Sequence, residues 1–201
     1  NHTQTQANRL FCTTHRMTQT TPNYKKTLNL PQTSFPMRGN LAQNEPQSVK
    51  RWEKENLYEA IQDARSDADH FIFHDGPPYA NGHIHMGTAL NKILKDMVTK
   101  FHQMDGKDSV YVPGWDCHGL PIEWKIEEQY RKNKKDKDKV PIKDFRSECR
   151  EFAEKWIKIH IEEFKRLGVE GDWQNYYSTM SFDAEAQIVR ELGKFLLDGT
   201  L

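Results

Sequence analysis

The 201-residue chain carries 29 Lys and Arg against 29 Asp and Glu, so its net charge gives no indication of a nucleic-acid partner. Apolar residues make up 36% of the chain, and no apolar run approaches the ~18 residues that a membrane helix needs. The cysteines, Cys12, Cys117 and Cys149, are too scattered for a disulfide framework or a CxxC metal site, so we expect a reducing, cytoplasmic setting.

Residues 1–16 differ in composition from the rest, because they contain no Asp or Glu and are rich in Thr and Gln. Three interpretations are open: a mitochondrial transit peptide, upstream sequence that is not part of the native protein, or a disordered tail. We favour upstream sequence, because Met17 opens a stretch typical of a native N-terminus.

Residues 17–48 are polar and hold the prolines Pro22, Pro31, Pro36 and Pro46. Because repeated prolines block helices, this segment is expected to form an extended N-terminal arm. A first amphipathic helix is predicted next, from apolar residues at near-helical spacing: Val49, Trp52, Leu57, Ala60 and Ile61.

The following segment predicts a β-α-β unit. Phe71–Phe73 reads as a short buried strand, and the loop Gly76–Gly82 follows it. An apolar stripe then repeats at i, i+3, i+4 and i+7, which indicates the strongest helix of the chain: Leu90, Ile93, Leu94, Met97, Val98 and Phe101. Asp105-Gly106 ends this helix, and Val110–Val112 predicts a second strand. Such a unit implies a parallel sheet, whose ligands bind beyond the carboxyl ends of the strands.

Three further helices are expected. One runs from Pro121 to about Gln129 and precedes a basic loop at residues 131–139. A long amphipathic helix starts at a predicted N-cap, Asp144, and stops at Gly168. Its apolar-face positions are Phe145, Cys149, Phe152, Ala153, Trp156, Ile157, His160, Phe164 and Leu167. The last helix spans about 183–197, and we expect the chain to stop inside its domain.

The first chemically distinctive loop is GPPYANGHIHMGT, Gly76–Thr88, at a strand-to-helix junction. A helix N-terminus offers unpaired N–H groups and a partial positive charge, which suits a phosphate. His83 and His85 could donate to phosphoryl oxygens there, and Gly82 and Gly87 let a ligand approach the backbone. The spacing is neither a dinucleotide fingerprint nor a Walker A loop. The alternative is a tight turn with exposed histidines.

The second loop is GWDCHGLP, Gly114–Pro121, at the end of the second expected strand. Asp116 is its only acid and suits an ammonium ligand, although a role as a cap for the following helix is equally compatible. Cys117 and His118 could also be combined with His83 and His85 as a zinc site, but the spacing fits no common one.

Together these loops resemble class I aminoacyl-tRNA synthetases, and within them the bacterial-type isoleucyl enzymes. PYANGHIHMGT corresponds to the family's HIGH region, ALNKILKD continues the same helix, and GWDCHGLPIE matches the second active-site loop. TLNLPQTSFPMRGNLAQNEP upstream, and CREFA and RLGVEGDW downstream, also fit. The resemblance extends from about Tyr24 to the end of the chain.

The resemblance implies an α/β fold: the first half of a Rossmann-like parallel-sheet nucleotide-binding domain, with an N-terminal extended arm and flanking helices. Its domains would be a leader (1–16), the arm (17–48) and the first part of the catalytic domain (49–201), ending before an inserted editing domain. The implied ATP-binding residues are Pro78, Tyr79, Ala80, Asn81, Gly82, His83, Ile84, His85, Met86, Gly87 and Thr88.

Within this set the resemblance implies catalytic roles for His85 and Thr88, and an isoleucine pocket formed in part by Pro77 and Asp116. Thr88 stands where the motif has its last His, which puts one phosphate contact in doubt because a hydroxyl is shorter and never cationic. No metal ligand is expected in this chain.

The implied reaction is activation of isoleucine by ATP with Mg²⁺, followed by transfer to tRNA(Ile). A piece holding half the active site is expected to be inactive alone, and the whole enzyme to be monomeric, with any zinc in its C-terminal part. The main alternative is an RNA-binding module, in which the basic loop at 131–139 and the aromatic residues Trp115, Trp124 and Tyr130 would bind single strands. A mixed Lys/Asp run is more typical of a solvated loop.

Overall fold

The computed structural model describes residues 23–201, so the expected leader, Cys12 and the start of the arm lie outside the described residues. The chain divides into two units, the first ending at Gly39 and the second starting at Asn40. In the first unit a short 3-10 helix, η1 (Tyr24–Thr27), is followed by chain without helix or strand, as expected for an arm. None of the helices in the described part of the chain is long and apolar enough to cross a membrane.

Two helices open the second unit where one was predicted. They are α1 (Leu41–Lys54) and α2 (Leu57–Arg65), separated at Asn56, whose φ of 48° lies in the left-handed region that Asn tolerates. Helix α1 begins inside the segment that was expected to be extended, and Pro46 lies in its interior. Proline removes one helical hydrogen bond. Contacts with α5 (Ile142–Arg166) hold α1 in place despite this loss, and they include an ion pair between Glu45 and Arg166 at 2.8 Å.

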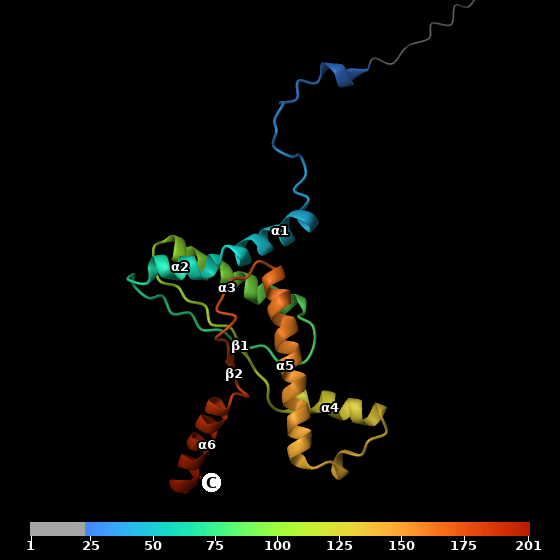
Figure 1. Ribbon diagram of the computed structural model, residues 1–201, viewed down its shortest axis with the longest axis vertical. Helices are drawn as coiled ribbons and strands as arrows, with labels where there is room; N and C mark the ends of the chain where they lie inside the picture. Colours follow the sequence, from blue (N-terminus) through green and yellow to red (C-terminus); the bar gives the residue numbers. More distant parts are fainter. Residues whose placement is uncertain (1–22) are drawn as a thin grey trace, which may run out of the picture. The chain divides into compact units, whose positions relative to one another are not determined.

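Three chain segments run parallel at the centre of the second unit. Strand β1 (Gly114–Trp115) pairs in parallel with β2 (Tyr177–Ser178), in the register Gly114↔Tyr177 and Trp115↔Ser178. Isolated parallel bridges at His70↔Asp108 and Tyr79↔Asp116 align a third segment with β1. The chain is therefore mostly helical with a small parallel sheet (Figure 1).

The two strands expected at 71–73 and 110–112 are not formed. The segments meet only near their ends, and a cavity of about 660 Å³ lies between them. Ile72 is 79% exposed, so the expectation of a buried strand at 71–73 was wrong. Apolar composition favours a strand, but the ladder also needs a partner at hydrogen-bonding distance along its whole length.

The remaining helices follow the sequence prediction closely. They are α4 (Leu120–Lys132), α5 and α6 (Phe182–Leu197). The short 3-10 helix η2 (Lys137–Lys139) lies in the segment expected to be a basic loop. Gly168 ends α5 with φ of +81°, as expected of a C′ glycine, but the predicted N-cap is wrong: Pro141 occupies that position and Asp144 lies in the first turn. Figure 1 shows α5 as the longest helix, extending from α1 at one end to α4 at the other. Its apolar face packs with Trp115 and Tyr111 in the main core.

Helix α3 (Met86–Met104) forms as predicted but buries the opposite face. Its buried residues are Lys92, Thr99 and Gln103. The predicted apolar stripe is largely exposed: Leu90 at 58%, Leu94 at 53%, Met97 at 60%, Val98 at 37% and Phe101 at 59%. The periodicity identified the helix correctly, but within residues 23–201 its apolar face is not the one that is buried.

Candidate active site

The two distinctive loops meet through their backbones. The Asp116 amide donates to the Pro78 carbonyl at 2.9 Å, and the Ala80 amide donates to the Asp116 carbonyl at 3.1 Å. This parallel bridge brings Pro77, in the first loop, close to the Asp116 loop. Pro77 also lines the 660 Å³ cavity together with Val110 and Val112, whereas Asp116 does not line it. Tyr79 and Asp116, which are 37 positions apart, thus pair at one edge of the small sheet, where ligands of parallel sheets bind.

The N-terminus of α3 is capped by His85. The imidazole Nδ1 accepts the Thr88 amide at 3.2 Å, and Nε2 lies 3.2 Å from the Thr88 hydroxyl. Because Nδ1 accepts, Nε2 of the neutral ring carries the proton and donates to that hydroxyl, which leaves the hydroxyl's own proton for another acceptor. A Cβ on Gly87 would lie 3.0 Å from Cε1 of His85, so glycine at this position makes room for the capping ring.

Helix α5 holds the end of the first loop. The carboxylate of Glu163 lies 2.5 Å from Nδ1 of His83 and accepts the Ile84 amide at 3.1 Å. Burial alone would raise the pKa of Glu163, but these two hydrogen bonds outweigh it and lower that pKa. One turn earlier, His160 contacts the Gly82 carbonyl through Nε2 at 2.5 Å. The histidine predicted at the helix entry, His83, is therefore engaged by α5 rather than pointing only to solvent.

A buried charge cluster anchors the start of the same loop. Asp75 forms ion pairs with Lys92 and Lys95 from α3 and accepts a hydrogen bond from the Tyr111 hydroxyl at 2.8 Å. Burial alone would raise the pKa of Asp75, but the hydrogen bonds from the two lysines outweigh it and lower that pKa. Burial, with the charge of Asp75, raises the pKa of Tyr111 far above its usual range, so the hydroxyl stays protonated as the donor.

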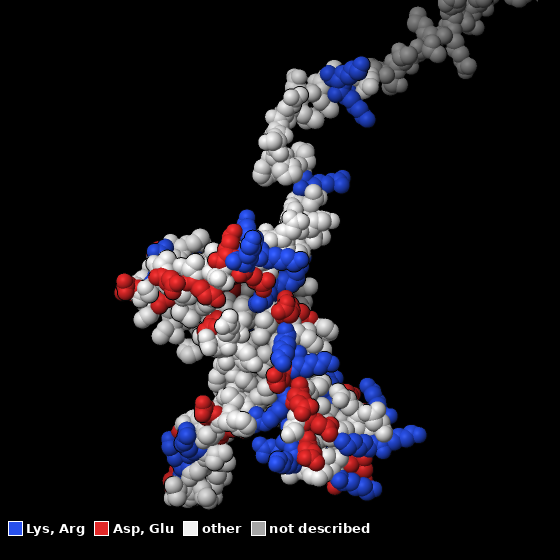
Figure 2. All heavy atoms as spheres, in the orientation of Figure 1, with Lys and Arg blue, Asp and Glu red and all other residues white. Residues whose placement is uncertain are grey.

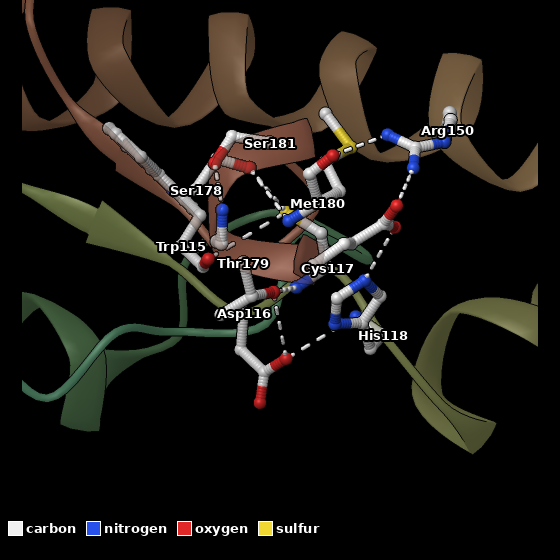
Figure 3. Close-up of polar contacts among 11 residues, drawn as sticks. Trp115, Asp116, Cys117, His118, Arg150, Ser178, Thr179, Met180 and Ser181 are labelled. Carbon is white, nitrogen blue, oxygen red and sulfur yellow. Dashed lines mark hydrogen bonds and ion pairs between the residues drawn. The ribbon is translucent and has the colours of Figure 1, made fainter. Parts of the chain in front are cut away.

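The side chain of Asp116 is fixed at one oxygen. Its Oδ1 accepts the His118 amide at 3.3 Å and lies 3.5 Å from the Thr179 hydroxyl, which in turn accepts the Cys117 amide at 2.9 Å (Figure 3). No hydrogen bond among residues 23–201 is made to the second oxygen, Oδ2. The N-cap of α4 is Gly119, with no side-chain cap, so the alternative role of Asp116 as a helix cap is wrong.

The segment after β2 is tied to α5 beside this loop. Glu185 of α6 lies 2.5 Å from the guanidinium of Arg150 and 3.2 Å from Nε2 of His118. Figure 3 labels Arg150 and His118. Burial alone would raise the pKa of Glu185, but the hydrogen bonds from His118 and Arg150 outweigh it and lower that pKa. Arg150 also donates to the Met180 carbonyl. The second loop is therefore braced by two later elements of the chain.

The zinc interpretation finds no support in these positions. His83 lies against Glu163 and His118 against Glu185, so the two histidines face different carboxylates. Burial raises the pKa of the Cys117 thiol, which disfavours the thiolate that zinc requires. Within residues 23–201, no three His, Cys, Asp or Glu side chains are grouped so that they could hold a metal ion.

The RNA-module interpretation is contradicted. Trp115 and Tyr130, two of its three stacking residues, are buried at 0% and 4% exposure. The third, Trp124, has the guanidinium of Arg131 over its ring. The basic loop is paired with acids: Lys135 with Glu148, and Lys137 with Glu127. On the face that Figure 2 draws, Lys/Arg and Asp/Glu are interleaved over α4 and the start of α5.

Comparison with known proteins decides the family. Residues 47–201 match the family described as "tRNA synthetases class I (I, L, M and V)". The chain belongs to the class I tRNA synthetases. The region described here is thus part of a class I synthetase catalytic region, and both distinctive loops fall within the match.

Individual relatives agree with this assignment. The chain is 68% identical over 177 residues to an isoleucine–tRNA ligase of Pelagibacter ubique, covering 88% of this chain and 20% of that protein. It is 61% identical over 186 residues to the isoleucine–tRNA ligase of Brucella abortus biovar 1, covering 92% and 19%. The chain spans about a fifth of the length of these relatives.

A solved structure shares the fold. The ternary complex of Agrobacterium radiobacter K84 AgnB2 LeuRS, tRNA and LeuAMS matches with a TM-score of 0.59 and 20% identity. The match covers 81% of this chain and 18% of that chain.

Several residues of the site were not identified as functional from the sequence. His160 and Glu163 were read only as part of an amphipathic helix, and Thr179 and Asp75 carried no prediction. A usable signal existed for His160, because a histidine on an otherwise apolar helix face needs hydrogen-bond partners when buried. Thr179 gave no such signal, since its partners are 62 and 63 residues away.

Proposed function

We propose that this chain is a segment of an isoleucine–tRNA ligase, which activates isoleucine with ATP and transfers it to tRNA(Ile). The observation that carries the proposal is the backbone bridge between the two loops at Pro78–Ala80 and Asp116, which joins the loop leading into α3 to the Asp116 loop. The 68% identity to a ligase of this specificity supports the choice of amino acid.

In the proposed first step, an isoleucine carboxylate oxygen attacks the α-phosphorus of ATP. The bond to the bridging oxygen breaks, and isoleucyl-adenylate and pyrophosphate form. The terminal ribose hydroxyl of tRNA(Ile) then attacks the acyl carbon and releases AMP. The protein contributes mainly by positioning two anions and stabilising the developing phosphate charge.

We assign ATP binding to the residues Pro78, Tyr79, Ala80, Asn81, Gly82, His83, Ile84, His85, Met86, Gly87 and Thr88. The partial positive charge of the α3 N-terminus favours a phosphate there. We assign catalytic roles to both His85 and Thr88: the Thr88 hydroxyl would donate to a phosphate oxygen in the transition state, and His85 would act through that hydroxyl, to which its Nε2 donates. The contact between His85 and Thr88 supports this pairing of roles, because it orients the hydroxyl. Mg²⁺ would arrive with the nucleotide.

We assign the isoleucine ammonium to Asp116 and part of the side-chain pocket to Pro77. Oδ2, which accepts no hydrogen bond in the described part of the chain, supports the first role, because an ammonium is well bound by a carboxylate already fixed at its other oxygen. Because isoleucine and valine differ by one methylene, which an apolar pocket distinguishes weakly, we also propose that the whole enzyme edits in an inserted domain.

The proposed domain organisation follows from the same assignment to an isoleucine–tRNA ligase. Residues 49–201 would be the first half of a Rossmann-like domain, preceded by the arm at 17–48 and a non-native or disordered leader at 1–16. The three parallel segments support a β-α-β unit of this kind. We propose that the enzyme is a cytoplasmic monomer with any zinc in its C-terminal part, and that residues 1–201 alone catalyse no isoleucine-dependent pyrophosphate exchange.

The test uses a chimeric ligase, in which this chain replaces the matching segment of the 68% identical relative. Asp116→Asn is expected to weaken isoleucine binding by ~2–4 kcal/mol and to leave ATP affinity within about threefold, because only the charge pair is lost. Calorimetric titration with each ligand measures both. Equal loss of the two ligands, or unchanged isoleucine binding, would remove Asp116 from the proposed site.

A further inference from the structure

His160 joins the two active-site loops through one imidazole ring. Its Nδ1 lies 3.1 Å from Nε1 of Trp115, next to Asp116, and its Nε2 lies 2.5 Å from the Gly82 carbonyl, in the last turn before α3. The side chain is 2% exposed. A buried ring with both nitrogens bonded fixes the distance between the loops more firmly than either contact alone.

The chemistry of the two partners sets the state of this ring. The indole Nε1 of Trp115 is only a donor, so Nδ1 of His160 must be an acceptor. The Gly82 carbonyl is only an acceptor, so Nε2 must carry the proton. A protonated ring would place two N–H groups where one partner can only donate. The geometry therefore requires the neutral ring with its proton on Nε2, and burial lowers the pKa of His160 in agreement.

Glu163 supports the same arrangement three residues later on α5. It accepts the Ile84 amide and lies against His83, so α5 contacts three consecutive residues of the first loop, Gly82 to Ile84. The charged and titratable groups around the ring are His83, Glu163 and Lys92. His160 itself faces backbone and indole, not the space beyond the α3 N-terminus.

We propose that His160 is a positioning residue, which sets the phosphate-binding end of the first loop relative to the Asp116 loop. This inference rests on the proposed function, because it assigns the first loop to ATP and the second to isoleucine. Reaction between two bound substrates depends on their relative placement, and a displacement of about 1 Å is enough to lower a rate on the order of 100-fold.

The variants separate hydrogen bonding from packing. His160→Gln keeps one acceptor and one donor in its amide, whereas His160→Leu fills the space and has neither. Phe164→Leu is the matched control, because Phe164 lies one turn further on α5, is equally buried and contacts Trp115 only through its ring. All three are made in the chimeric ligase and assayed well below their melting temperatures.

Pyrophosphate exchange measured against ATP and isoleucine gives the result. We expect His160→Leu to lower kcat about 100-fold, His160→Gln to recover to within about tenfold of the parent, and Phe164→Leu to stay within about threefold. Equal losses in His160→Leu and Phe164→Leu, or no recovery with Gln, would overturn the proposal.

Two further measurements keep the test decisive. If His160→Leu does not fold, ¹⁵N NMR of the unsubstituted 201-residue chain still applies: we expect a slowly exchanging Nε2–H and an unprotonated Nδ1, and a proton on Nδ1 would overturn the proposal.

Asp116→Asn and His85→Ala are assayed in the same series. Full activity in both would contradict the proposed function, whereas full activity in His160→Leu alone would contradict only this inference.

Discussion

Helices α5 and α3 have the same kind of sequence pattern, but their apolar faces differ in burial. Both repeat apolar residues at helical spacing. The apolar face of α5 is buried, with Ala153, Ile157 and Phe164 in the main core. That of α3 is largely exposed, and its buried residues are Lys92, Thr99 and Gln103. Periodicity therefore identifies a helix and its apolar side, but it does not identify what packs there.

The difference arises from the neighbours that each helix meets. Helix α5 lies beside Trp115 and both loops, so its apolar residues have partners within residues 23–201. Helix α3 faces the loop and α5 with its polar side, where Lys92 meets Asp75 and Lys100 donates to the Gly168 carbonyl at 2.8 Å. In this part of the chain α5 stabilises the fold by apolar burial, whereas α3 is attached through charged groups.

The largest effect is expected from deleting a core side chain of α5. Phe164→Ala should lower the free energy of unfolding by ~3–5 kcal/mol, because it removes apolar burial and leaves a cavity. Leu94→Ala, the matched truncation on α3, should change it by less than about 0.5 kcal/mol because the side chain is already exposed. Urea denaturation of the 201-residue chain measures both, and similar losses would abolish the contrast between the helices.

A charge deletion on α3 should come next. Lys92→Ala is expected to cost about 3 kcal/mol, the lower end for breaking a buried ion pair, because Lys95 and Tyr111 still contact Asp75. The exposed Lys158, which pairs with Glu154 on α5 at 2.9 Å, is the control, and its change to Ala should cost much less than Lys92→Ala because solvent screens the pair. A loss below that of Lys158→Ala would show that the Asp75 cluster does not hold α3.

A substitution at the N-terminus of α3 is expected to affect catalysis rather than stability. Thr88→Ala in the chimeric ligase should lower pyrophosphate exchange about 100-fold, the lower end for losing one donor to a transition-state anion. Thr88→His should be tolerated. Exchange at the parent rate in Thr88→Ala would mean that the hydroxyl donates to no phosphate oxygen.

The smallest expected effect is a dependence of stability on pH. The pKa of Asp75 is lowered in the folded chain, so its stabilising contribution is present above the unfolded pKa and is lost as pH falls through the folded pKa. Acid titration of urea midpoints should therefore show a decline below about pH 4. Asp75→Asn should show a shallower decline, and an identical one would assign the acid sensitivity to other carboxylates.

The sequence alone identified the family motifs, the ends of most helices and the residues of both loops. These depend on local chemistry: Gly168 and Gly199 adopt the positive φ that ends a helix, and Met86–Met104 has the spacing of an amphipathic helix. The resemblance carried by the loops was confirmed by the family match at residues 47–201.

Only the tertiary structure decided which of these elements meet. The exposure of the α3 stripe and the unpaired segments at 71–73 and 110–112 both depend on neighbours distant in sequence. The contacts of His160 with Gly82 and Trp115 span 78 and 45 residues. Local pattern fixes a side chain's direction from its own backbone, but a hydrogen bond also needs a partner whose position the rest of the fold determines.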